Sequence, residues 1–314
     1  MKKKLVTIGI PCYNEEENVE LFYKKIISII KEIKPYQFRI LFVDNGSTDK
    51  TETKIKSLIK KDKKIIGIFL SRDFGPEASV QAVLNYAPGD ALITLSCDFQ
   101  DPPELIPKFI NKWQQGYHMV AGIYTKSEDD KITAFLRQTF YLIFKKMSNI
   151  YIPVNASGVG LMDRKTIEAL KSLPEKYRFF RGLKSWVGFK TAYITYERKK
   201  RQYGVSSYNN FFDYFKHAER GLFGFSYLPL DLMVYSGFIL TLLSFVFVVG
   251  YLFTVLFFGN PIKASIPLLL SNIFFGGIQL FAISIIGKYI QVVVEETKAR
   301  PSYIVKDIIN LSTE

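Results

Sequence analysis

Short apolar runs alternate with amphipathic stretches along the first 123 residues of the chain. The apolar runs have the lengths of buried strands, and they are Lys4–Ile10, Phe38–Val43, Ile65–Leu70, Ala91–Leu95 and His118–Ile123. The stretches between them place apolar residues at helical spacing, and they are Glu15–Lys34, Thr48–Lys61, Glu77–Tyr86 and Pro103–Gln115. Four strand–helix units of this length predict an α/β fold, with a mainly parallel sheet and helices on both faces.

Two strongly apolar runs without charged residues occur much later, at Leu232–Phe258 and Ala264–Gly287. As helices at about 1.5 Å per residue they would extend roughly 36–40 Å, enough to cross a hydrocarbon core of about 30 Å. Two buried helices of a soluble domain are the alternative interpretation. The connection Gly259–Lys263 is short and contains Asn260-Pro261, which favours a transmembrane hairpin.

The basic residues near the hairpin predict its orientation. The connection between the two runs carries a single cation, Lys263, whereas several flank the outer ends, namely Lys216, Arg220, Lys288, Lys298, Arg300 and Lys306. The positive-inside rule therefore places both termini and the preceding domain in the cytoplasm, in an integral protein of the cytoplasmic membrane. Lys2–Lys4 resemble the start of a signal peptide, but the apolar stretch after them ends too soon, at Pro11.

The net charge of +13 lies almost entirely before the hairpin, since residues 1–231 carry +12. Such a domain could suit nucleic acid, but no zinc-finger, helix-turn-helix or RNA-recognition pattern is present. An anionic bilayer and phosphate-bearing substrates explain the same charge, so we expect no nucleic-acid partner. Cys12 and Cys97 form no metal or disulfide pattern and fit a reducing compartment, and the two histidines exclude a histidine metal cluster.

Polar loops follow three of the predicted strands. They are Pro11–Glu16, Asp44–Asp49 and Asp98–Glu104. Each has a local explanation, because Asn14 and Thr48 could cap helices and Asn45-Gly46 could form a turn. In a parallel sheet, however, the carboxyl ends of the strands meet at one edge, where ligands bind near the topological switch point. Three acid-bearing loops at that edge favour a binding site.

The succession of motifs resembles the membrane-anchored polyprenyl-phosphate glycosyltransferases, which are family-two inverting enzymes with the Rossmann-like GT-A fold. This group is related to dolichol-phosphate mannose synthase and bactoprenol glucosyltransferase. The resemblance covers nearly the whole chain, at Pro11–Glu16, Val43–Thr48, Ser71–Gly75, Asp98–Glu104, Gly158–Arg164, Phe180–Gly182, Arg201–Tyr208, Phe225–Leu230 and Gly287–Ile304.

The resemblance implies a nucleotide-diphosphate sugar as donor and assigns it to the first two loops, at Pro11, Tyr13, Asn14, Glu15, Asp44, Gly46 and Ser47. Asp98 and Gln100 lie two apart, so at an extended strand end both side chains would point the same way. Carboxylate and amide oxygens suit Mg²⁺ or Mn²⁺, which would neutralise charge on the departing diphosphate. Asp101 is assigned to the catalytic group, although a helix N-terminal acid is the alternative.

Two departures from the family pattern concern acids. Ser96 stands where relatives usually carry the first metal-loop aspartate, and Gly158 stands where many carry a candidate base. A lipid phosphate is already anionic and can attack without a base, whereas a hydroxyl acceptor gains from one. A phosphate acceptor needs cations to position it instead. We expect these from Arg201 and Arg198, with Arg137, Arg178, Arg181 and Lys200 as further candidates, unless this basic surface only contacts lipid headgroups.

The region before the hairpin mixes aromatic and basic residues. Tyr208–Phe225 has the composition of an interfacial helix, and Ile132–Ile150 is either another or an ordinary helix packed on the sheet. The predicted organisation is a catalytic domain at 1–207, an interfacial segment at 208–230, the hairpin at 231–292 and a cytoplasmic tail at 293–314.

Three functions fit this sequence. The favoured one transfers a sugar from a nucleotide-diphosphate sugar, expected to be a UDP-hexose, to polyprenyl (undecaprenyl) phosphate. The product is a lipid-linked monosaccharide for cell-surface glycan modification. A processive polysaccharide synthase is less consistent, because Trp113 and Trp186 are not preceded by arginine and more spans would be needed. The third is a non-catalytic scaffold for a lipid-sugar flippase. The resemblance also implies a homo-oligomer, with a flippase and a downstream glycosyltransferase as possible partners.

Overall fold

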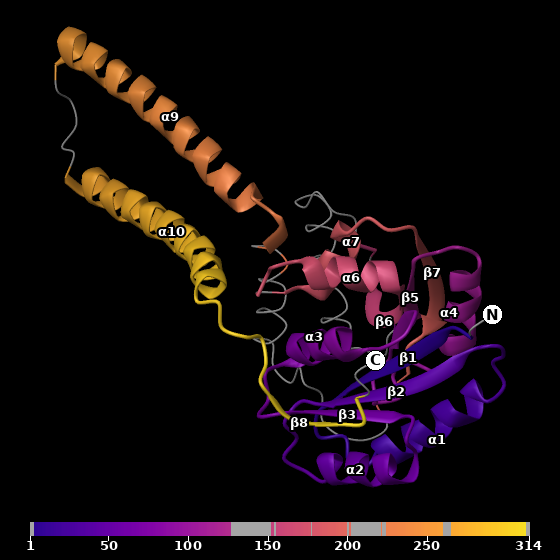
Figure 1. Ribbon diagram of the computed structural model, residues 1–314. Coiled ribbons are helices and arrows are strands. Elements are labelled where there is room, and N and C mark those ends of the chain that lie inside the picture. Colours follow the sequence, from indigo (N-terminus) through magenta and orange to yellow (C-terminus); the bar gives the residue numbers. More distant parts are fainter. Residues whose placement is uncertain are drawn as a thin grey trace.

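The computed structural model describes residues 3–126, 155–176, 178–199, 224–259 and 265–311, together with residues 152, 153, 201 and 221. The segment Ile132–Ile150, Arg137, Lys200 and most of Tyr208–Phe225 lie outside the described residues. The chain forms an α/β domain from which a long helical hairpin extends (Figure 1).

The domain is built on an eight-stranded sheet in the order β7-β5-β6-β4-β1-β2-β3-β8. The strands are β1 Leu5–Cys12, β2 Gln37–Asp44, β3 Ile65–Leu70, β4 Ala91–Thr94, β5 Met119–Lys126, β6 Ala156–Asp163, β7 Thr191–Glu197 and β8 Val305–Ile309. The first four strands run parallel, while β6 and β8 run antiparallel to their neighbours. The predicted α/β class with a mainly parallel sheet is confirmed.

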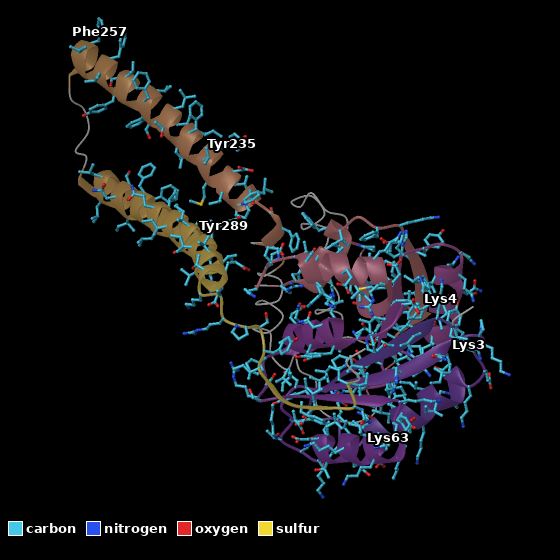
Figure 2. The ribbon with its side chains drawn as sticks, viewed as in Figure 1. Lys3, Lys4, Lys63, Tyr235, Phe257 and Tyr289 are labelled. Atoms are coloured by element: carbon cyan, nitrogen blue, oxygen red, sulfur yellow. The ribbon has the colours of Figure 1, made fainter. Side chains whose placement is uncertain are left out.

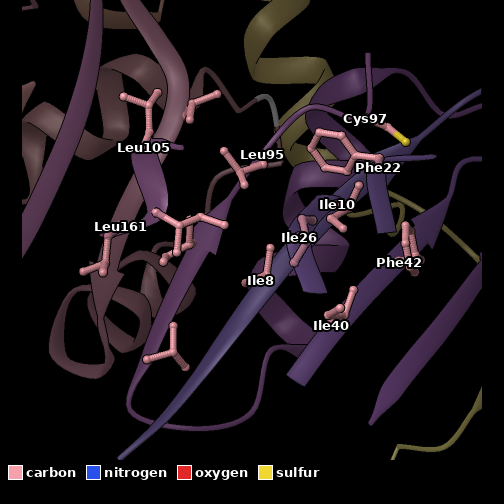
Figure 3. Close-up of a cluster of buried hydrophobic side chains, with 14 of the residues drawn as sticks. Ile8, Ile10, Phe22, Ile26, Ile40, Phe42, Leu95, Cys97, Leu105 and Leu161 are labelled. Carbon is pink, nitrogen blue, oxygen red and sulfur yellow. The ribbon is translucent and has the colours of Figure 1, made fainter. Parts of the chain in front are cut away.

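Helices cover both faces of the sheet, as the apolar runs predict. They are α1 Val19–Ile30, α2 Thr51–Lys61, α3 Pro76–Tyr86, α4 Leu105–Gln114, α6 Arg164–Ser172 and α7 Phe180–Trp186. Alternate residues of β2 point to opposite faces, so Ile40 and Phe42 pack with α1, α2 and α4 (Figure 3). Leu41 and Val43 pack with α3, α6 and α7 on the other face. Burial on both faces explains why these strands read as continuous apolar runs.

The hairpin consists of α9 Leu228–Phe258 and α10 Ser265–Thr297, both long and apolar enough to be candidate membrane spans. Their large apolar side chains, such as Phe257, are exposed along the length of both helices (Figure 2). The Tyr289 hydroxyl of α10 donates to the carbonyl of Ser226, 2.7 Å away, and so joins the domain-proximal ends of the two helices. An exposed apolar surface of this extent is typical of helices that contact a membrane or another protein.

The last strand, β8, lies in the region that the sequence analysis assigned to a tail. It pairs with the edge strand β3, and the backbone N–H of Ser71 donates to the carbonyl of Ile304 at 2.9 Å. Asn310 donates to the carbonyl of Ile65 at 3.1 Å, and Lys306 forms an ion pair with Glu52 at 3.0 Å. The chain therefore returns from the hairpin to the α/β domain and covers the edge of its sheet.

Candidate active site

The three acid-bearing loops meet at the switch point of the sheet. The chain proceeds from β1 to β2 and β3 on one side and then crosses back to place β4 on the other side of β1. The connections that follow β1 and β4 therefore lead to opposite sides of the sheet, toward β2 and β5, and this is where open α/β sheets bind ligands. The Pro11–Glu16 and Asp98–Glu104 loops border it directly.

The first two loops are joined by side-chain to backbone hydrogen bonds. The side-chain oxygen of Asn14 accepts the backbone N–H of Thr48 at 2.8 Å, and the backbone N–H of Asn14 donates to the Ser47 hydroxyl at 2.9 Å. The N–H of Glu15 donates to the Thr51 hydroxyl at 2.8 Å. Asn14 has a φ of +53°, a conformation that asparagine tolerates better than most residues. Asn14 thus shapes both loops, and it does not cap a helix.

Gly46 allows the loop after β2 to pack against the residues that follow β3. A Cβ at this position would lie 2.3 Å from the backbone carbon of Arg72, and the φ of Gly46 is +72°. The neighbouring Asn45 amide donates to Asp73 at 2.6 Å and accepts the N–H of Phe74 at 3.1 Å. The loop after β2 is therefore fixed between the loops after β1 and β3.

Asp44 is a fully buried carboxylate at the end of β2. One of its oxygens accepts from the Ser47 hydroxyl, and the other, Oδ2, is buried with no hydrogen-bond partner among the described residues. Burial raises the pKa of Asp44 to about 6, although the bonds from Ser47 act in the opposite direction. An unpartnered buried oxygen of this kind suits a donor group on a ligand, such as a ribose hydroxyl.

Glu15 and Arg201 form a largely buried ion pair between the first loop and the segment after β7. The second Glu15 oxygen accepts from the Asn18 amide at 2.6 Å. Burial raises the pKa of Glu15 to about 7, while Asn18 and Arg201 lower it. Sequence reasoning placed Glu15 with the donor and Arg201 with the acceptor, and in the structure the two side chains are in contact.

The loop after β4 differs from the expected extended strand end. Residues 97–100 form a turn in which Phe99 has a φ of +59°, and the N–H of Gln100 donates to Asp98 at 3.1 Å. The premise that Asp98 and Gln100 point the same way along a strand is therefore wrong. Phe99 packs edge-on against Phe22, with ring centroids 5.0 Å apart, and this contact holds the turn in place. Within the described residues, no group of three acidic, histidine or cysteine side chains is placed to hold a metal.

Arg198 occupies the position next to this turn. Its guanidinium donates to the Gln100 amide oxygen at 2.9 Å, lies 3.8 Å from Asp101 and stacks 5.6 Å from the centre of the Tyr124 ring. Asp101 is buried and also accepts from the Tyr196 hydroxyl. Burial raises the pKa of Asp101, while Arg198 and Tyr196 lower it. Sequence reasoning missed Tyr196, because one tyrosine within a strand gives no signal of a partner 95 residues away.

The remaining predicted residues are spread around this edge. Pro11 lies in β1 opposite Val43 of β2, and Arg181 lies on α7. Arg178 is not available for a ligand in this structure, because its guanidinium donates to the carbonyls of Leu170, Leu173 and Glu175. The first two of these carbonyls belong to the end of α6, which Arg178 stabilises.

Comparison with known proteins identifies the family. The model of the family described as glycosyl transferase family 2 matches residues 7–170, which include the three loops and β6. The chain belongs to glycosyl transferase family 2. This glycosyltransferase is 37% identical over 303 residues to the bactoprenol glucosyl transferase of Shigella phage SfV, covering 96% of this chain and 98% of that protein.

Two further relatives align over nearly their whole length. A prophage bactoprenol glucosyl transferase homolog of Escherichia coli K12 is 36% identical, covering 96% of this chain and 99% of its own. An uncharacterized glycosyltransferase of Synechocystis is 35% identical, covering 98% of this chain and 96% of its own. Family membership and the sheet topology together confirm the expected GT-A class of fold.

Proposed function

We propose that this glycosyltransferase transfers a sugar, with inversion, from a nucleotide-diphosphate sugar to polyprenyl phosphate and so forms a lipid-linked monosaccharide. The observation that carries the proposal is the full-length similarity to bactoprenol glucosyl transferases, which extends through both candidate membrane spans. UDP-hexose is the proposed donor and undecaprenyl phosphate the proposed acceptor. The product would serve cell-surface glycan modification.

The donor is proposed to bind between the loops after β1 and β2. Asp44 offers a buried oxygen without a described partner, and Glu15 lies near the end of the neighbouring loop, where its N–H donates to Thr51. Tyr13 would stack on the base, while Pro11, Asn14, Gly46 and Ser47 would shape the surface against which the nucleotide lies. The network of hydrogen bonds between the two loops would hold this surface ready for the donor.

A divalent cation, Mg²⁺ or Mn²⁺, fits this site through a single protein carboxylate. Asp98 lies at the switch point and uses one oxygen within its turn, so the carboxylate can still ligate a cation held jointly by the donor's phosphates and water. Gln100 would join it only after Arg198 releases its amide oxygen. When bound, the cation would supply charge neutralisation for the departing nucleotide diphosphate.

Cations supplied by this chain are proposed to position the acceptor. Arg201 and Arg198 lie on the segment after β7 and reach the loops on both sides of the switch point. Each arginine would exchange its present acceptor, Glu15 for Arg201 and Gln100 for Arg198, for an oxygen of the anionic phosphate when the acceptor arrives. A phosphate oxygen carries its own negative charge, so its attack on the anomeric carbon requires no base at Gly158. Arg181 is kept as a further contact, and Asp101 as a residue that positions Arg198.

The hairpin is proposed to span the cytoplasmic membrane with both termini in the cytoplasm. The basic residues at its outer ends favour that orientation. The acceptor phosphate would then meet the site at the cytoplasmic leaflet. A homo-oligomer, a flippase that moves the product and a downstream glycosyltransferase that uses it complete the proposed setting.

The test is an assay of detergent-solubilised protein with radiolabelled nucleotide sugars, Mg²⁺ or Mn²⁺ and undecaprenyl phosphate. We expect one nucleotide sugar to give a labelled product that extracts into organic solvent, and expect neutral undecaprenol to give none. A polymeric product would indicate a processive synthase instead. Metal-dependent donor binding without transfer to any polyprenyl phosphate would refute the proposed acceptor.

A further inference from the structure

Lys184 is a cation at the active-site edge to which the proposed reaction has so far given no role. It lies on α7, and its ammonium group donates to the carbonyl of Gly158 at 3.1 Å. Gly158 belongs to β6, which runs antiparallel to β4 with Gly160 opposite Thr94. Gly158 precedes Gly160 by two residues on the antiparallel strand, and Thr94 is the last residue of β4. Gly158 therefore lies just past the carboxyl end of β4, on the side of the turn that carries Asp98.

The space beside Gly158 is open. Among the residues that the structure describes, no heavy atom lies within 4 Å of a Cβ placed at this position, and the residue is exposed. The other β6 glycine in this region is different, since a Cβ on Gly160 would lie 2.2 Å from the carbonyl oxygen of Val120. An ammonium group therefore borders this open space, the slot beside Gly158, next to the proposed metal and donor site.

The helix that carries Lys184 also contacts the base of the hairpin. Gly182 packs so closely on Phe225 that a Cβ would lie 2.6 Å from the ring, and Phe179 lies 6.1 Å from the same ring. Phe225 precedes α9 by three residues. α7 thus connects the start of the first candidate span to the slot beside Gly158, which is the direction from which a headgroup-level phosphate would arrive.

We propose that Lys184 binds the phosphate of the lipid acceptor in the slot beside Gly158. This inference rests on the proposed function, and it assigns Lys184 to the acceptor and not to the donor diphosphate. Glu77 and Arg181 are the charged neighbours that act on it. Burial lowers the pKa of Lys184 to about 8, so the ammonium form still predominates at neutral pH. The lysine is half-buried, so a ligand would reach its ammonium group from the side of Gly158.

The absence of an acid at residue 158 gains a physical reason from this arrangement. A carboxylate there would pair with the ammonium and repel an incoming phosphate, whereas glycine leaves both the space and the charge available. The carbonyl of Gly158 holds the lysine in place until the acceptor arrives, because a neutral carbonyl competes weakly with a phosphate for an ammonium group.

The experiment compares Lys184→Gln and Lys184→Arg with the wild-type protein, measuring KM for undecaprenyl phosphate and KM for the nucleotide sugar separately. Lys190→Gln, which removes the same charge from an exposed lysine beside Tyr117, is the matched control. We expect Lys184→Gln to raise the acceptor KM about tenfold or more, the worth of one hydrogen bond to a charged group, with the donor KM changed less than twofold. Lys184→Arg should restore most of the acceptor affinity.

Each outcome decides a separate point. Glutamine keeps an N–H donor for the carbonyl of Gly158, so a purely structural lysine would leave the acceptor KM of Lys184→Gln unchanged and overturn the inference. A rise in the donor KM alone would assign Lys184 to the diphosphate and overturn it as well. A wild-type protein that transfers no sugar to any polyprenyl phosphate would overturn the proposed function itself.

Gly158→Asp gives an independent test at the other side of the slot. The open space should allow the variant to fold, and its carboxylate should raise the acceptor KM in the presence of Lys184. A lower acceptor KM in this variant would contradict a phosphate in the slot.

Discussion

Replacing Asp44 by asparagine should stabilise the ligand-free protein while removing its affinity for the donor. Asp44 is fully buried, and its Oδ2 atom has no hydrogen-bond partner in the part of the chain that the structure describes. Burial raises its pKa from 3.8 to about 6, so the folded state holds a proton that the unfolded state has lost between these values. The contribution of this group to stability is therefore fully present below pH 3.8 and is lost as the pH rises through about 6.

The size of the effect follows from the shift. A shift of about two pK units means that keeping Asp44 ionised in the folded protein costs about 3 kcal/mol at pH 8. Asparagine removes this cost, but burying its unpartnered amide group costs about 1 kcal/mol. The net gain of about 2 kcal/mol should raise Tm by roughly 4–8 °C in a domain of this size. Thermal unfolding in detergent at pH 8 and pH 5 measures it, and the gain should shrink by more than half at the lower pH.

The matched control is Glu32→Gln, which removes an exposed carboxylate and should leave Tm unchanged at both pH values. Binding of UDP, measured on the same preparations, should be lost in Asp44→Asn and should weaken in the wild-type protein as the pH falls below about 6. A variant that is less stable than the wild type at pH 8, or a gain that is independent of pH, would refute the argument from burial.

Three further substitutions test the site. Asp98→Ala should abolish transfer while the protein still folds and inserts, because the hydrogen bond described for Asp98 is a local one within its turn, from the N–H of Gln100; near-normal turnover would remove its metal role. Arg201→Ala should raise the acceptor KM more than the donor KM, and an unchanged acceptor dependence would count against it. It should also move the pH dependence of donor binding upward, because Glu15 loses a cation that lowers its pKa. Gly46→Ala should lower stability by about 2 kcal/mol or more, since its Cβ would meet the Arg72 backbone at 2.3 Å. Gly116→Ala, at a similar positive φ in open space, should cost less, and equal losses in Tm would show that strain alone accounts for the effect.

The sheet and its helices could be predicted because burial on two faces leaves a strong pattern. Ile40 and Phe42 alternate with Leu41 and Val43, and both pairs are buried, so β2 appears in the sequence as an uninterrupted apolar run. The loops could be placed at one edge because parallel strands end on the same side. The two candidate spans were predictable because length and apolarity alone define them.

The details of the site depend on contacts that single segments do not encode. Phe99 adopts a positive φ although it is not glycine, because its ring packs against Phe22 of α1. In this turn the backbone N–H of Gln100 donates to Asp98, while the side-chain oxygen of Gln100 accepts from Arg198. The pairing of Glu15 with Arg201 joins residues 186 positions apart, and no local periodicity predicts it. Short polar segments therefore identify the site, while distant packing determines which side chains are free.

The return of the chain to β3 limits how the α/β domain can turn relative to the hairpin. Ile304 lies beside the carboxyl end of β3. The chain from Thr297, the last residue of α10, to Ile304 spans at most about 25 Å when extended, so the end of α10 must lie within that distance of β3. The N–H of Lys176 also donates to both carboxylate oxygens of Glu296, at 3.0 and 2.8 Å, while Phe225 packs on α7 at the other helix. A single attachment would let the domain rotate freely about the hairpin, whereas attachments at α7, at Lys176 and at β3 limit that rotation. Since α7 contacts Gly158 and Ile304 contacts the end of β3, both at the carboxyl edge of the sheet, we expect the hairpin to keep this edge, and the cations that line it, turned toward the membrane surface.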